Sequence, residues 1–183
     1  MTSPGNNTAT TPAATADVRP FEWLTSPASL GNLVHQYVLN KNGDASSKPD
    51  AAASLKALHV GCGSSTVGEF LVQDLGFGSV VNVDRDYEIM EQMEERWRAI
   101  GRLQHDDCKP SGASRMEFLT QDFTKERLPE QYDNSFDLVL DKSTLDCTLC
   151  SDIATASLLV EVYRTLKKDG GVYMVISFHE LDL

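Results

Sequence analysis

The sequence predicts an α/β fold built on a doubly wound, mostly parallel sheet. Five short apolar runs alternate with segments whose apolar residues recur at helical spacing. A glycine turn follows the first run, and the chain carries neither an internal repeat nor a cysteine framework that would favour another architecture. With 183 residues, the chain has the size of one domain.

The first 53 residues precede this alternating pattern. Residues 1–19 are rich in Thr, Ala, Pro and Asn and have almost nothing to bury, so we expect a disordered tail, with a transit peptide as the alternative. Apolar residues at helical spacing between Leu30 and Val38 predict an amphipathic helix. We therefore expect a tail over 1–19, a helix and polar linker over 20–53, and the main domain over 54–183.

The main domain is predicted to consist of five strands separated by helices. Apolar runs predict strands over 57–60, 79–83, 116–119, 136–140 and 172–176. Apolar residues at steps of three or four predict helices over 67–75, 89–100 and 158–166. The polar residues 101–114 are expected to form a loop. Because ligands bind beyond the carboxyl ends of parallel strands, the residues just after each run are the candidates for function.

Charge and composition restrict the class of partner. Sixteen Lys and Arg against 27 Asp and Glu give a formal net charge of −11, which argues against nucleic acid and favours a basic partner. No apolar run approaches the roughly 18 residues of a membrane span, so we expect no membrane association. The four cysteines form no disulfide framework and predict a reducing, cytoplasmic location. Cys147 and Cys150 have the spacing of half a zinc site, but a structural site needs four ligands, so we predict no metal.

Two strand ends together predict a nucleoside site. Gly61 and Gly63 lie in the turn between a strand and a helix, where glycine lets a ligand approach the backbone closely. Asp84 ends the second apolar run, at a spacing from Gly61 that lets a carboxylate accept hydrogen bonds from a ribose. We predict an adenosine-type ligand, and a tight turn beside a surface aspartate is the alternative interpretation.

The other strand ends favour S-adenosylmethionine over NAD. The dinucleotide fingerprint needs a third glycine where this chain has Thr66. After the third run, Asp122 can accept a hydrogen bond from an adenine amino group while Phe123 packs on the ring. An NAD-dependent oxidoreductase remains the competing interpretation, which measured binding of the two cofactors would decide.

Four blocks of the sequence resemble the class I S-adenosylmethionine-dependent methyltransferases, whose fold is Rossmann-like. The resemblance covers about residues 21–178 and is narrower to the eukaryotic lysine methyltransferases that act on translation elongation factor 1-alpha. The most specific block is a strand followed in the family by Asp-Lys-Gly-Thr-Leu-Asp, and this chain has Ser143 in place of the glycine. The four blocks are Phe21-Glu22-Trp23, Gly61-Cys62-Gly63-Ser64-Ser65, Val81-Asn82-Val83-Asp84 and residues 135–146.

The resemblance implies a role for each matching residue around the cofactor. Gly61 and Gly63 would lie under its methionine part, and Asp84 would hold its ribose, with Arg85 beside it. The same resemblance implies that Asp122 and Phe123 frame the adenine.

At the reacting end, the resemblance implies that Asp141 and Lys142 lie beside the sulfonium and that Trp23 closes over the cofactor from the N-terminal helix. Asp141 and Asp146 are the carboxylates nearest to the expected mouth, and we predict that they are catalytic by orienting an acceptor amine. A lysine amine must lose a proton first, because its ordinary pKa is about 10.4. His59 is expected to be packed rather than catalytic.

The predicted function is S-adenosylmethionine-dependent methylation of a protein lysine, with a basic translation factor as the favoured partner. The family adds two strands after the fifth, whereas this chain ends at Leu183, so we expect a sheet that lacks its last two strands. This leaves open a non-catalytic or truncated protein that binds S-adenosylmethionine. A small-molecule methyltransferase is a further alternative, because function on this fold is set by the loops.

Overall fold

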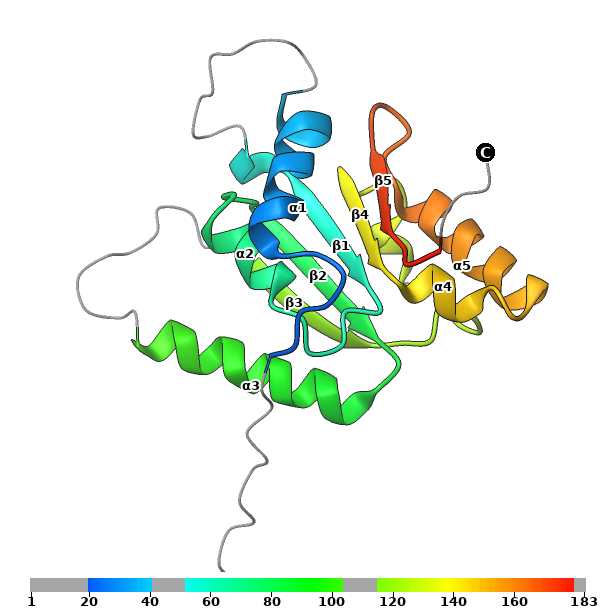
Figure 1. Ribbon diagram of the computed structural model, residues 1–183, viewed down its shortest axis with the longest axis horizontal. Helices are drawn as coiled ribbons and strands as arrows, with labels where there is room; N and C mark the ends of the chain where they lie inside the picture. The colour runs from blue at the N-terminus through cyan, green and yellow to red at the C-terminus, as the bar shows by residue number, and fades with distance from the viewer. Residues whose placement is uncertain (1–19, 41–51, 104–114, 180–183) are drawn as a thin grey trace, which may run out of the picture.

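The computed structural model describes residues 20–40, 52–103 and 115–179, which are built around one parallel sheet (Figure 1). The strands lie side by side in the order β3-β2-β1-β4-β5, and every neighbouring pair is parallel. This confirms the predicted α/β fold and its five strands. The strands are β1 (Lys56–Val60), β2 (Ser79–Asp84), β3 (Arg115–Thr120), β4 (Leu138–Lys142) and β5 (Val172–Ile176).

The strand order changes direction between β1 and β4. The chain proceeds from β1 to β2 and β3 on one side and then returns to add β4 and β5 on the other side. Open parallel sheets bind their ligands at such a switch point, beyond the carboxyl ends of the strands. The turn after β1 and the segment after β4 are therefore the parts of the fold that frame a site.

One predicted strand is displaced by two residues. The run 136–140 was expected to be the fourth strand, whereas β4 begins at Leu138 and contains Asp141 and Lys142. Asp137 is used elsewhere, because its Oδ2 accepts a hydrogen bond of 2.9 Å from the backbone N–H of Lys56 at the start of β1. Phe136 forms an isolated bridge to Leu166. The other four strands agree with their predictions to within one residue.

Helices cover both faces of the sheet (Figure 1). Residues of α1 (Pro27–Val34), its π-helical continuation (His35–Leu39), α2 (Val67–Gln73) and α3 (Tyr87–Leu103) share one hydrophobic core with the sheet. Leu158 and Val162 of α5 (Asp152–Thr165) share a second core on the opposite face. Alternate residues of β1 supply both cores, since Ala57 belongs to the first and Leu58 to the second.

Three helical features differ from the sequence prediction. The helix α4 (Thr144–Thr148) was not predicted, because five residues are too few to show apolar residues recurring at helical spacing. α5 starts six residues earlier than predicted, since Ser151 caps it by accepting a hydrogen bond from Ala154 while its first turn is exposed. α3 includes residues 101–103, which were expected to be loop, because a helix continues past its last buried residue; 104–114 lie outside the described residues.

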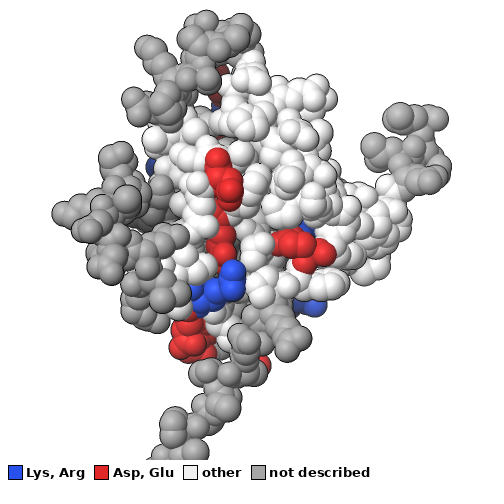
Figure 2. Space-filling view, turned by 60° about the vertical axis from the view of Figure 1, so that its left-hand side comes forward, with Lys and Arg blue, Asp and Glu red and all other residues white. Residues whose placement is uncertain are grey.

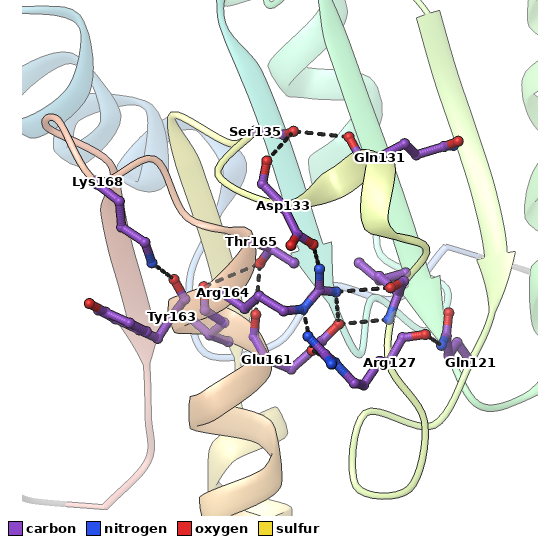
Figure 3. Close-up of polar contacts among 12 residues, drawn as sticks. Gln121, Arg127, Gln131, Asp133, Ser135, Glu161, Tyr163, Arg164, Thr165 and Lys168 are labelled. Atoms are coloured by element: carbon purple, nitrogen blue, oxygen red, sulfur yellow. Dashed lines mark hydrogen bonds and ion pairs between the residues drawn. The ribbon is translucent and has the colours of Figure 1, made fainter.

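A network around Arg164 fixes the segment between β3 and β4 onto α5 (Figure 3). The carboxylate of Glu161 accepts hydrogen bonds from the backbone N–H of Leu128 at 2.6 Å and from Arg164 Nε at 2.9 Å. The Arg164 guanidinium also donates to the carbonyl of Leu128 at 2.9 Å and forms an ion pair with Asp133. The segment that follows β3 is therefore held by the mostly buried charges of Arg164 and Glu161 and by the half-exposed carboxylate of Asp133.

The surface carries charges of both signs on the side of the sheet that holds α2 and α3. Basic side chains lie next to acidic ones on the face shown in Figure 2. Glu94 and Arg98 form an ion pair within α3, and Arg96 of α3 pairs with Glu69 of α2 at 2.8 Å. No helix in the described parts of the chain is both long enough and apolar enough to cross a membrane.

Candidate functional site

The glycine turn after β1 presents an open position at Gly63. Both Gly61 and Gly63 have positive φ, 57° and 51°, which side chains other than glycine rarely adopt. A Cβ on Gly61 would lie 2.0 Å from Oγ1 of Thr144, so Gly61 lets the turn pack directly against α4. A Cβ on Gly63 would meet nothing within 4 Å. Gly63 is therefore the position at which a ligand can approach the backbone of this turn.

Asp84 joins the end of β2 to the same turn. Its Oδ2 accepts a hydrogen bond of 2.9 Å from the backbone N–H of Gly63, and its Oδ1 accepts one of 3.0 Å from Asp86. Arg85 follows it on the surface. The sequence placed Gly63 and Asp84 at two separate strand ends, and the structure brings them into direct contact. Their predicted contacts with a cofactor remain predictions.

Asp122 and Phe123 follow β3 and lie in different environments. Hydrogen bonds from Thr124, together with the neighbouring Lys125, lower the pKa of Asp122 to about 2, so its carboxylate is charged at neutral pH. Phe123 is 6 % exposed and belongs to the core shared with α5. It also lines a cavity of about 170 Å³ together with Ser157. Whether these two residues frame an adenine remains a prediction.

Asp141 lies inside the fold. Its carboxylate accepts hydrogen bonds from the backbone N–H groups of Thr144 at 2.7 Å and Leu145 at 3.1 Å, and from the hydroxyl of Tyr173 at 2.9 Å. Burial raises the pKa of Asp141 above its ordinary value, although these hydrogen bonds act in the opposite direction. Asp141 thus fixes the first turn of α4 against β5.

Asp146 connects α4 to the segment after β5. Burial alone would raise its pKa, but hydrogen bonds from Ser177, Ser143 and the backbone of Phe178 together lower the pKa of Asp146. Asp146 is 8 % exposed, whereas Asp141 is fully buried. Of the two predicted catalytic carboxylates, Asp146 therefore has the lowered pKa and the slightly greater exposure.

Ser143 stands where the family pattern has glycine, and its backbone is left-handed, with φ 69° and ψ 10°. Glycine adopts this conformation without strain, whereas an L side chain does not. The hydroxyl of Ser143 donates a hydrogen bond of 2.8 Å to Asp146, which holds the serine in this conformation. The departure from the family pattern therefore keeps the geometry of the turn.

Lys142 and Trp23 are both predicted to bind the cofactor. The structure links them through one N-terminal segment, because Lys142 contacts Glu22, the residue before Trp23. The side chain of Lys142 is 3 % exposed, and its ammonium contacts Glu22 and, at 3.2 Å, Ser65. Trp23 does not lie on the N-terminal helix as predicted, because this helix begins only at Pro27; its ring lies 6.2 Å from the ring of Phe178. Glu22 was not among the predicted functional residues, although it lies in the first of the four family blocks.

His59 is fully buried next to this group, as expected for a packed residue. Burial and the nearby charge of Lys142 lower the pKa of His59 to about 4, so the imidazole is neutral at physiological pH. Among the described residues, no group of three or more His, Cys, Asp or Glu side chains is arranged to hold a metal.

Comparison with known proteins decides the family. The sequence model of the methyltransferase domain family matches residues 52–182. The chain belongs to this family. It is 34% identical over 162 residues to the eEF1A lysine and N-terminal methyltransferase of Bos taurus. This alignment covers 86% of this chain but only 19% of that protein. It is also 31% identical over 160 residues to the methyltransferase srdJ of Neurospora crassa, in an alignment that covers 86% of this chain and 60% of that protein.

Solved structures confirm the methyltransferase fold. The mmp1179 protein of Methanococcus maripaludis, described as an S-adenosyl-L-methionine-dependent methyltransferase, superposes with a TM-score of 0.55 at 17% identity, covering 81% of this chain and 53% of that one. The cyclase SpnF superposes with a TM-score of 0.55 at 20% identity, covering 80% and 43%. This chain thus spans about a fifth of the length of the eEF1A lysine and N-terminal methyltransferases that it matches and about half of these structures.

The methyltransferase family and fold imply S-adenosylmethionine as the cofactor, as the sequence predicted. The residues of the site fit this group. The open position at Gly63 leaves room for the ligand at the turn, and the acceptor-only carboxylate of Asp84 lies directly beside it for a ribose.

Proposed function

We propose that this chain transfers a methyl group from S-adenosylmethionine to an amine of a protein, with a lysine of a basic translation factor as the favoured acceptor. The observation that carries the proposal is the contact between Gly63 and Asp84, at the switch point of a methyltransferase-type sheet. The similarity to the eEF1A lysine and N-terminal methyltransferases of Bos taurus and Homo sapiens, at 34% and 32% identity, supports a protein amine as acceptor.

The residues of this chain bind and align rather than attack. S-adenosylmethionine, when bound, supplies a methyl group activated by its sulfonium, so no nucleophilic side chain is required. Gly61 and Gly63, with their positive φ, would let the turn approach the methionine part, and Asp84, which holds the N–H of Gly63, would accept hydrogen bonds from the ribose hydroxyls. Rigid alignment of donor and acceptor lowers the barrier of such an in-line displacement.

Asp146 is the proposed orienting group for the acceptor. A carboxylate can accept roughly four hydrogen bonds. Asp146 already accepts three, from Ser143, Ser177 and Phe178. The remaining position can receive a hydrogen bond from an acceptor ammonium before the amine loses its proton. Asp141 holds the turn that carries Asp146, and its own predicted contact with the amine would require this turn to open.

The charge of the chain supports a basic acceptor. A net charge of −11 attracts a basic protein and disfavours nucleic acid. We also propose a cytoplasmic location, because Cys62, Cys147 and Cys150 are free thiols, which suits a reducing compartment.

Calorimetric titration with S-adenosylmethionine, S-adenosylhomocysteine and NAD tests the cofactor, and transfer of radiolabelled methyl to purified eEF1A and to cell extract tests the acceptor. Gly63→Asn is the matched variant, because asparagine tolerates positive φ while its side chain fills the open position. We expect the wild-type protein to bind both sulfur ligands and Gly63→Asn to bind neither. Binding of NAD alone would overturn the proposal, and binding without any labelled protein would favour a non-catalytic protein.

A further inference from the structure

Residues 20–26 form a strap that reaches the glycine turn from the N-terminal side. Glu22 is the anchor of this strap. Its carboxylate accepts hydrogen bonds from the hydroxyl of Ser65 at 2.9 Å and from the backbone N–H of Thr66 at 2.5 Å, and it forms an ion pair with Lys142. Ser65 and Thr66 immediately follow the glycine turn. The strap is therefore fastened to the same turn that the cofactor needs.

The ion pair between Glu22 and Lys142 is largely removed from water. The side chain of Lys142 is 3 % exposed and that of Glu22 is 20 % exposed. A buried ammonium is costly without a charged partner, and Glu22 is the only carboxylate that contacts Lys142 among the described residues. The strap thus supplies the counter-charge for a lysine that lies 120 residues further along the chain.

Two further features show that contacts, rather than local backbone preference, hold the strap in place. Leu24 has a φ of 67°, a conformation that is unfavourable for leucine. Trp23 and Phe21 are 43 % and 66 % exposed, so neither aromatic side chain of the strap is anchored in the core. Besides the ring contact of Trp23 with Phe178, the polar contacts of Glu22 are therefore the main attachment of the strap to the rest of the described fold.

We propose that Glu22 is a positioning residue that latches the strap across the glycine turn, so that exchange of the cofactor requires the Glu22–Lys142 ion pair to open. The inference rests on the proposed cofactor site, which it extends by one residue and by a kinetic role. Release of the demethylated product, S-adenosylhomocysteine, would then be limited by opening of the latch.

Two variants test the latch. Glu22→Gln keeps the size of the side chain and removes its charge, and the double variant Glu22→Gln/Lys142→Met also removes the buried charge that the single variant leaves unpaired. Glu94→Gln is the control, since it breaks only the exposed ion pair with Arg98 on α3. The measurements are the dissociation rate of S-adenosylhomocysteine and, without any ligand, the hydrogen exchange of the backbone amides of residues 21–26.

We expect both Glu22 variants to accelerate ligand dissociation and strap exchange by about tenfold or more, and the control to change neither. If the double variant restores wild-type values, Glu22 only neutralises Lys142 and the latch is overturned. Faster exchange of the strap with an unchanged dissociation rate would also overturn it. A wild-type protein that binds no S-adenosylhomocysteine would instead refute the proposed function, so the two failures are distinguishable.

Discussion

Ser143 is the residue at which this chain departs from its family pattern, and its left-handed backbone makes the departure measurable. The strain of such a conformation costs an L residue about 1–2 kcal/mol. The hydrogen bond from Ser143 to the charged carboxylate of Asp146, at 2.8 Å, is worth about 2 kcal/mol. Ser143→Ala loses the bond and keeps the strain, so we expect a loss of about 2 kcal/mol. Ser143→Gly loses the bond but relieves the strain, and the entropy of glycine in the unfolded chain offsets part of that relief, leaving a loss of about 1 kcal/mol.

The free energy of unfolding in urea, measured for both variants, checks this reasoning. Glycine should be more stable than alanine at position 143 by about 1 kcal/mol. The matched control is Ala156→Gly in the exposed part of α5, where glycine should be less stable than alanine by about 1 kcal/mol. Replacing alanine by glycine should therefore raise the free energy of unfolding at position 143 and lower it at position 156. An alanine variant as stable as the glycine variant at position 143 would refute the claim that strain is stored there.

Three further predictions concern the turn, the buried network and acid stability. Gly61→Ala should prevent stable folding in a thermal melt, because its Cβ would lie 2.0 Å from a side-chain oxygen, whereas Gly63→Asn should fold and fail only in calorimetric cofactor binding. Glu161→Gln should lower the free energy of unfolding by about 3 kcal/mol, since it removes a charge that a mostly buried Arg164 needs; a loss below about 1 kcal/mol would contradict this. Asp122 has a lowered pKa, so it stabilises the folded state above its unfolded value of 3.8 and loses this contribution as pH falls to about 2. Unfolding curves of wild type and Asp122→Asn should therefore converge over this range.

The sheet could be predicted from the sequence because each of its strands contains a run of apolar residues. Burial on both faces makes β1, β2 and β4 continuous apolar runs, and this signal does not depend on distant residues. The start of β4 could not be predicted, because Asp137 leaves the strand to bond Lys56, which is 81 residues away. α4 has only five residues, too few for apolar residues to recur at helical spacing, and its first turn is fixed by hydrogen bonds to the carboxylate of Asp141.

The candidate site was predicted in part for the same reason. Gly63 follows the end of β1 and Asp84 ends β2. Because these two strands are parallel neighbours, their carboxyl ends bring the two residues together. Glu22 belongs to no strand end, and its partner Lys142 was assigned to the cofactor edge. An ion pair between residues 120 positions apart leaves no periodic signal in one sequence, so only the folded arrangement reveals it.

The dipeptide Asp141-Lys142 explains how one motif can organise both sides of the switch point. Successive residues of a strand point to opposite faces of the sheet. Asp141 therefore faces Tyr173 and the first turn of α4, and Lys142 faces Glu22 and the turn before α2. One residue fixes the segment that carries Asp146, and the next fixes the strap that carries Trp23. Because both lie on β4 beside β1, a shift of this strand would move the proposed acceptor side and the proposed cofactor latch together.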